Sequence, residues 1–176
     1  MTADREARVW QLDGVLLDVL SELGAPFERV EAGAYLVELH GTRRPTTQVW
    51  LIAGAQAVAV EAFVMHVVQN AVPDPLALHR HLLRRNLGLR DVHYAVDDVG
   101  DVFLVGSLPE PSAELVDRVL GEVLQLLEQD ADALPYLAYG DRLDTDPALA
   151  AKVGYDGAGR RPAGTPDWAP RRDARR

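Results

Sequence analysis

The chain has 176 residues, with 27 acidic and 18 basic side chains, a formal net charge of −9 and no cysteine. That length predicts one domain whose core can fold without disulfides, and the missing thiols exclude disulfide bonds, thiolate catalysis and cysteine metal sites. The negative charge disfavours nucleic-acid binding, and the lack of an apolar leader or a long apolar run predicts a cytoplasmic protein without a membrane span.

The first part of the chain predicts a helix followed by strands. Apolar residues at helical spacing indicate a helix from about Arg5 to Leu23, and Gly24 suits a left-handed position at its end. A short strand is expected over Phe27–Glu31, and alternating residues predict a second strand over Ala34–His40. A turn then leads into the most apolar part of the sequence.

Two apolar segments, Thr47–Ala53 and Ala57–Val67, are separated by three residues and predict a tight antiparallel hairpin. A buried helix is the alternative, but Gly54 interrupts the stretch and β-branched and aromatic residues dominate it. Both faces of the two strands are apolar, whereas an antiparallel sheet with one wet face alternates more cleanly. The second face therefore needs a cover, which is the chain's own Leu134–Tyr139 segment, a second copy or a partner protein.

The middle of the chain predicts a capped helix and a hairpin. Asp74 can cap a helix that begins with a proline, and Asn86 and Gly88 are candidate stop residues because both tolerate positive φ. Alternation and an apolar run then predict strands over Val92–Val96 and Val102–Val105, joined by an acidic loop.

A third helix is indicated by a strong amphipathic pattern that ends near Asp130. Ser112 is a plausible N-cap, although Pro111 at the first helical position would move the cap to Glu110. The element order is therefore helix, three or four strands, helix, two strands, helix. Runs of strands with hairpin-length links between single helices are typical of an α+β domain with an antiparallel sheet.

Beyond the third helix the composition shifts toward proline and glycine. We expect a domain over residues 1–130, an extension over residues 131–159 that packs on it, and a flexible basic tail over residues 160–176. Within the extension, Leu134–Tyr139 has enough apolar surface to pack, and Asp146 can cap two helical turns. The tail carries six Arg against two Asp, so its charge is opposite to that of the body.

Several segments together resemble the YbjN-domain family. They are the strand AYLVEL, the paired strands around VWLIAGAQAVAVEAFV, the helix end HLLRRN, the hairpin HYAVDDVGDVFLVGSLP and the helix LVDRVLGEVLQLLEQ. The resemblance covers roughly Val9 to Asp130, most specifically Leu82 to Leu127. It implies a compact α+β domain similar in fold to type III secretion chaperones, often a dimer, without recognised enzymatic activity and loosely linked to sensory regulation or stress responses. The long tail departs from the family pattern.

No motif in the sequence indicates catalysis, a cofactor or a strong metal site, so we expect none of these. The five histidines lack the i,i+4 spacing of a helical zinc site. Asp97, Asp98 and Asp101 cluster near one turn, where aspartate serves turn geometry or, alternatively, holds a divalent cation weakly. A small metal-binding or hydrolytic enzyme that uses this acidic cluster is therefore one alternative function.

The sequence favours a non-enzymatic, chaperone-like or regulatory module that binds a protein partner or forms a homodimer. The apolar second face makes Trp50, Phe63 and Met65 candidate partner-binding residues. Arg84 and Arg85, in the last turn of the second helix, either complement the helix dipole or dock against an acidic partner. A structural adaptor tethered by its basic tail is a further alternative.

Overall fold

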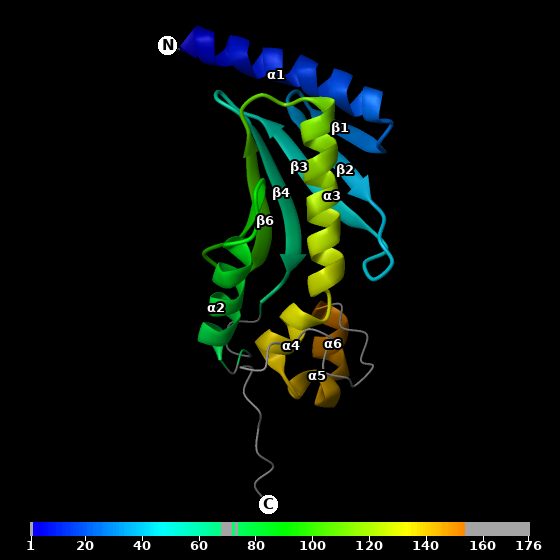
Figure 1. Cartoon of the computed structure of the whole chain (residues 1–176), viewed down its shortest axis with the longest axis vertical. Coiled ribbons are helices and arrows are strands. Elements are labelled where there is room, and N and C mark those ends of the chain that lie inside the picture. The colour runs from blue at the N-terminus through cyan, green and yellow to red at the C-terminus, as the bar shows by residue number, and fades with distance from the viewer. Residues whose placement is uncertain (1, 68–71, 73, 154–176) are drawn as a thin grey trace, which may run out of the picture.

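Alternating apolar residues and tight turns fold the chain into an antiparallel sheet with helices packed on it (Figure 1). The computed structural model describes residues 2–67, 72 and 74–153. The strands in this part of the chain are β1 (Phe27–Glu31), β2 (Ala34–Leu39), β3 (Thr47–Ala53), β4 (Val58–Met65), β5 (Val92–Val96) and β6 (Val102–Leu108). The helices are α1 (Thr2–Leu23), α2 (Pro75–Asn86), α3 (Ala113–Asp130), α4 (Ala133–Tyr139), α5 (Arg142–Thr145) and α6 (Pro147–Val153). The expected α+β class and element order are confirmed.

The sheet of the described residues has the order β1-β2-β3-β4-β6-β5, and every neighbouring pair is antiparallel. Because β4 pairs with β6 rather than β5, the β5–β6 hairpin joins the sheet with its second strand inside. β1 and β5 are therefore the two edges. The tight hairpin expected between β3 and β4 is present, and Gly54 N donates to the carbonyl of Ala57 at 2.9 Å.

The hydrophobic core lies on one face of the sheet, against α1 and α3. In Figure 1, α3 runs along this face and α1 lies across its upper end. Every second residue of β3 and β4 points into the core, which is why these strands alternate between buried and exposed positions. The fully buried large side chains are Leu16 and Leu20 of α1, Tyr35 and Val37 of β2, Val49 and Leu51 of β3, Val58 of β4, Leu104 and Leu108 of β6, Leu127 of α3, and Leu134 and Tyr139 of α4.

α1 is fastened to the β1–β2 hairpin through Asp13, whose side chain is 7% exposed. The carboxylate of Asp13 accepts hydrogen bonds from Arg29 Nη2 at 2.5 Å, Gly33 N at 2.9 Å and the Tyr35 hydroxyl at 2.6 Å. Burial by itself would raise the pKa of Asp13, but the bonds from Tyr35 and Gly33 and the charge of Arg29 outweigh it and lower that pKa.

α2 begins as the sequence predicts, because the Asp74 side chain accepts a hydrogen bond from Ala77 N at 3.1 Å. The helix ends at Asn86, one of the two predicted stop residues, but not through positive φ: among the described residues only Gly24, Gly33, Gly100 and Gly140 have positive φ. The C-cap residue, Leu87, has an ordinary right-handed conformation. The amide of Asn86 bonds to the backbone of β5, so this residue has a tertiary role rather than a left-handed one.

The extension after α3 packs at the lower end of the domain, where α4 contacts α2 and α3 (Figure 1). The Tyr139 hydroxyl donates to the carbonyl of His66 at 3.1 Å, and Leu134 is buried. This segment closes the end of the core and leaves the second face of the sheet exposed. Leu134–Tyr139 is therefore not the cover of that face, which was one of the three alternatives from the sequence. Asp146 caps α6 as expected. The basic tail over residues 160–176 lies outside the described residues.

None of the helices in the described part of the chain is long and apolar enough to cross a lipid bilayer.

Candidate functional site

The face of the sheet turned away from α1 and α3 carries exposed and half-buried apolar side chains. On neighbouring strands these residues lie directly opposite one another, so they form one continuous surface. The pairs in register are Leu36 with Trp50, Ile52 with Ala59, Phe63 with Phe103, and Phe103 with Ala95. We call this surface the open sheet face, and its members are Leu36, Trp50, Ile52, Ala59, Phe63, Ala95, Phe103 and Val105.

Two of the three aromatic or sulfur-bearing residues predicted to bind a partner, Trp50 and Phe63, belong to the open sheet face. The Phe63 side chain is exposed, and its ring meets Phe103 edge to face with the ring centroids 5.6 Å apart. Glu61 lies at the centre of the face, opposite Trp50 on one side and Val105 on the other. The exposed carboxylate of Glu61 therefore has apolar residues opposite it on both neighbouring strands.

Met65, the third of these residues, is separated from Trp50 and Phe63. A register shift between Phe63 and Met65 interrupts the alternation of β4 where it pairs with β6, and both Val64 and Met65 are buried. Met65 therefore lies on the core side and not on the open sheet face. The expectation that Met65 and Phe63 face the same way is wrong because simple alternation fails at a bulge.

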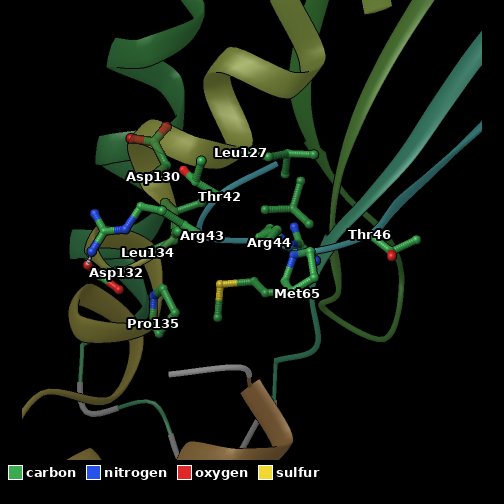
Figure 2. A pocket seen from close by; sticks show the side chains of 13 residues that line it. Thr42, Arg43, Arg44, Thr46, Met65, Leu127, Asp130, Asp132, Leu134 and Pro135 are labelled. Atoms are coloured by element: carbon green, nitrogen blue, oxygen red, sulfur yellow. Dashed lines mark hydrogen bonds and ion pairs between the residues drawn. The ribbon is translucent and has the colours of Figure 1, made fainter. Parts of the chain in front are cut away.

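Met65 lines a pocket of about 390 Å³ between the β2–β3 loop, the end of β4, the last turn of α3 and the start of α4 (Figure 2). We call it the Arg44 pocket. Its apolar lining residues include Val64, Met65, Leu127, Leu134 and Pro135, and its polar lining residues are Thr42, Arg43, Arg44, Thr46, Asp130 and Asp132. The half-buried Ala131 and the exposed Pro45 also line the pocket.

The β2–β3 loop is held beside the Arg44 pocket by Glu128 of α3. The carboxylate of Glu128 accepts the Thr42 hydroxyl at 2.5 Å and the backbone N–H groups of Arg43 at 2.9 Å and Arg44 at 3.1 Å. The bond from Thr42, together with these backbone donors, holds the pKa of Glu128 at about 2 against the opposing effect of desolvation. Gly41 stands so close that a Cβ there would meet the Glu128 carboxylate.

Both aspartates of the Arg44 pocket already have partners. Asp132 forms an ion pair with Arg43. Asp130, whose side chain is 8% exposed, accepts the Tyr94 hydroxyl at 2.5 Å and Arg85 Nε at 3.1 Å. Burial and the neighbouring Asp130 carboxylate raise the pKa of Tyr94, so its hydroxyl stays protonated and donates.

The two arginines predicted to bind a partner lie on α2, away from the open sheet face. Arg85 is engaged inside the domain, because it pairs with Asp130 and also donates to Gln129 Oε1 at 3.0 Å. Arg84 is exposed in the last turn of the helix. The structure therefore does not bring Arg84 and Arg85 together with Trp50 and Phe63 in one site.

The acidic tip of the β5–β6 hairpin has a structural role. Asp97 Oδ1 accepts hydrogen bonds from Val99 N at 3.0 Å and Asp101 N at 2.8 Å. Asp101 accepts from Val67 N at 2.9 Å and pairs with the His66 ring at 2.7 Å, which ties the tip to the end of β4. In the part of the chain that the structure describes, no three His, Asp or Glu side chains converge in a way that could hold a metal ion.

The Arg44 pocket is the feature that sequence reasoning missed. Glu128 looks like an ordinary residue on the wet side of an amphipathic helix, and its partners lie 84 to 86 positions earlier in the chain. No local pattern connects the two segments. The one available signal is the run of polar residues after β2, which reads as a simple turn.

The chain resembles proteins of known sequence and one complex of known structure. A chain in the crystal structure of the ExsC–ExsE complex aligns with 73% of this chain and 94% of its own length, with a TM-score of 0.49 and 18% identical residues. "Uncharacterized protein Mb0497" of Mycobacterium bovis and "Uncharacterized protein Rv0487" of Mycobacterium tuberculosis are each 42% identical over 108 residues, which is 60% of this chain and 57% of theirs. "Uncharacterized protein ML2442" of Mycobacterium leprae is 42% identical over 106 residues.

The chain thus spans little more than half the length of these mycobacterial relatives. A family model described as "YbjN: Putative bacterial sensory transduction regulator" matches residues 13–135, which run from the first half of α1 into α4. The resemblance seen in the sequence is confirmed: the chain belongs to the YbjN family.

Proposed function

We propose that this protein is a non-enzymatic, chaperone-like or regulatory module whose open sheet face binds an apolar segment of another protein. The observation that carries the proposal is the exposure of neighbouring large apolar side chains, with Ile52 41% and Phe63 43% exposed beside the half-buried Trp50. Contiguous apolar surface of this kind commonly marks a protein interaction site. Membership of a family described as a sensory transduction regulator supports a regulatory role.

The charge on the open sheet face indicates what kind of segment fits. Glu61 stands at its centre, and Glu38 is exposed on the same side of β2. A second copy docked on this face through a central two-fold axis would bring the two Glu61 carboxylates together, which is unfavourable. A partner segment with two or three apolar side chains and one Lys or Arg opposite Glu61 satisfies both the apolar and the charged part of the surface.

The alternative functions have less support. Asp97 and Asp101, which the enzyme alternative needs, accept hydrogen bonds that shape the hairpin tip. The adaptor alternative depends on residues 160–176, and deletion of that segment without loss of any partner would exclude it. A cytoplasmic location stays a prediction from the sequence.

A peptide array tests the proposal directly. The full chain is incubated with immobilised 15-residue peptides that share an apolar pattern and carry a Lys, a Glu or a Gln at one central position. We expect the Lys peptides to bind best. Phe63→Glu should abolish this binding, because it replaces a large apolar contact by a charge that loses water when the peptide docks, and Glu61→Lys should shift the preference to the Glu peptides.

Val99→Glu is the matched control, because Val99 is similarly exposed at 54% but lies at the hairpin tip. It should bind as the wild type does. Circular dichroism and thermal melting of each variant separate a binding defect from unfolding. Equal binding by the wild type and Phe63→Glu, or no peptide preference at all, would exclude the open sheet face as the binding surface.

A homodimer, the other partner that the sequence predicts, stays a prediction. Leu83 of α2 and Leu87, the C-cap residue of this helix, are 67% and 88% exposed, and neither belongs to the open sheet face. Since Glu61 disfavours pairing of two open sheet faces, we expect the second copy on α2. Light scattering of the wild type should then give the mass of a dimer, Leu83→Glu that of a monomer, and Phe63→Glu that of a dimer. A monomeric wild type refutes the homodimer.

A further inference from the structure

Arg44 is a half-buried cation whose hydrogen-bonding capacity is largely unused. A guanidinium has five N–H donors. Its Nη1 lies 3.5 Å from the carbonyl of Phe63, which is a long hydrogen bond, and none of the ion pairs formed by the described residues includes Arg44. Desolvation lowers the pKa of Arg44, and the electrostatic influence of Tyr94 and Glu128 offsets only part of this effect.

The other charged groups that line the Arg44 pocket contrast with Arg44, since each has a partner among the described residues. Arg43 pairs with Asp132, and Asp130 accepts from Arg85. Around the pocket there are three carboxylates and three guanidiniums. The carboxylates are those of Glu128, Asp130 and Asp132, and the guanidiniums are those of Arg43, Arg44 and Arg85. Among the described residues, the one acceptor recorded for the Arg44 guanidinium is the Phe63 carbonyl at 3.5 Å, so most of its N–H groups remain available to a ligand.

Apolar side chains form the rest of the cavity next to this guanidinium. Met65 extends into the pocket between Arg44 and Pro135, and Leu134 lines the same side (Figure 2). The volume of about 390 Å³ lies in the range of small-molecule sites. A cavity with an apolar wall and one under-coordinated cation matches a ligand that has an anionic head and an apolar body.

We propose that the Arg44 pocket binds a carboxylate that carries a short apolar chain. The carboxylate oxygens accept two N–H groups of the Arg44 guanidinium, whose planar fork matches a carboxylate. The apolar chain packs against Met65 and Leu134. Such a carboxylate comes from a free carboxylic acid or from the carboxyl terminus of a peptide. This site is separate from the open sheet face and does not depend on the proposed function.

Titration of the full chain with three probes of equal chain length tests the ligand chemistry. Hexanoate should bind saturably by calorimetry and shift the amide NMR signals of residues 42–44, 46 and 131–134. Hexan-1-ol and hexylamine should bind at least about tenfold more weakly, because neither offers a charged acceptor to Arg44. Absence of saturable hexanoate binding, or equal binding of hexan-1-ol, overturns the proposal.

Two further probes identify the source of the carboxylate. N-acetyl-Leu-Leu with a free carboxyl terminus is compared with the same dipeptide bearing a terminal amide. Stronger binding of the free acid dipeptide than of hexanoate indicates a peptide terminus, and binding of hexanoate alone indicates a free carboxylic acid. Both results require that the amide form binds more weakly than the acid form. Equal binding of the two forms contradicts a carboxylate site.

Variants connect the binding to the pocket. Arg44→Gln should lose at least about tenfold in hexanoate affinity, whereas Arg80→Gln, at an exposed position of α2 outside the pocket, should bind as the wild type does. Ala131→Leu fills the pocket but keeps Arg44, and it should also abolish binding. This second variant tests the pocket independently, in case Arg44→Gln does not fold. Ile52→Glu, on the open sheet face and outside the pocket, should leave hexanoate binding unchanged. Full affinity in Arg44→Gln or in Ala131→Leu refutes the assignment.

Discussion

The side-chain amide of Asn86, in the last turn of α2, forms two hydrogen bonds with the backbone of Tyr94 in the edge strand β5. Asn86 Nδ2 donates to the Tyr94 carbonyl at 3.0 Å, and Tyr94 N donates to Asn86 Oδ1 at 2.7 Å. At this position the amide occupies the place that a neighbouring strand would take. The backbone of Tyr94 is thereby unavailable for pairing with another chain at this edge.

Replacement of Asn86 tests this closure. Asn86→Ala leaves the N–H and the carbonyl of Tyr94 without partners at a part-buried position, so the free energy of unfolding should fall by about 1–3 kcal/mol. Urea denaturation measures this change. Asn86→Asp keeps the acceptor for Tyr94 N and should lose less. An alanine variant as stable as the wild type would show that water replaces the amide at no cost.

The buried carboxylate of Asp13 should be a major tether of α1. Asp13→Ala removes the acceptor for three donors, one of them the buried Tyr35 hydroxyl, and we expect a loss of about 2–4 kcal/mol in the free energy of unfolding. Asp18→Ala, at an exposed position of the same helix, is the control and should change little. A double-mutant cycle with Tyr35→Phe isolates the Asp13–Tyr35 interaction, and a coupling energy near zero would contradict the tether.

Glu128 should make the stability of the domain depend on acid pH. Its pKa falls from the ordinary 4.5 to about 2 in the folded state. Stability from a lowered carboxyl pKa is fully present above the unfolded value and is lost as pH falls toward the folded one. The stability difference between wild type and Glu128→Gln should therefore be constant above pH 4.5 and shrink toward pH 2. Glu110→Gln, at an exposed position before α3, should follow the wild-type profile. A difference independent of pH would refute the lowered pKa.

The Glu128 carboxylate should tolerate only glycine at position 41, because it lies where a Cβ atom would be. In Gly41→Ala the new methyl group meets the Glu128 side chain, so the β2–β3 loop must detach or shift. We expect faster amide hydrogen exchange at residues 41–44 and a lower melting temperature. Adding Glu128→Ala to this variant removes the clash. Glu128→Ala should therefore lower the free energy of unfolding by less in the Gly41→Ala background than in the wild type. Equal costs in the two backgrounds would contradict the steric explanation.

Local features of the chain were predictable from local signals. The strands Phe27–Glu31, Thr47–Ala53 and Val92–Val96 are where alternation and turn residues place them. The helix caps at Asp74 and Ser112 follow from a short polar side chain that accepts a nearby N–H, which needs only a few neighbouring residues. The domain bounds and the tail stay predictions.

The candidate sites were predictable only in part. Trp50 and Phe63 lie on the second face of the sheet, as the strand pattern predicts, and their role in partner binding stays a prediction. Met65 was assigned to the wrong face because the bulge after Phe63 depends on how β4 and β6 pair. Asn86 ends α2 as predicted, but the reason expected for it, tolerance of positive φ, is wrong, because its partner, the backbone of Tyr94, is on another element.

The sequence alone determined the α+β class, the order of the elements and the apolar character of both sheet faces, because periodicity and turn chemistry act over a few residues. Only the tertiary structure decided that α1 and α3 cover one face, that α4 closes the end of the core, and that Glu128 and Arg44 meet beside a pocket. Those outcomes depend on contacts between segments tens of residues apart. Such contacts are set by how whole helices and strands pack, and no local sequence pattern indicates them.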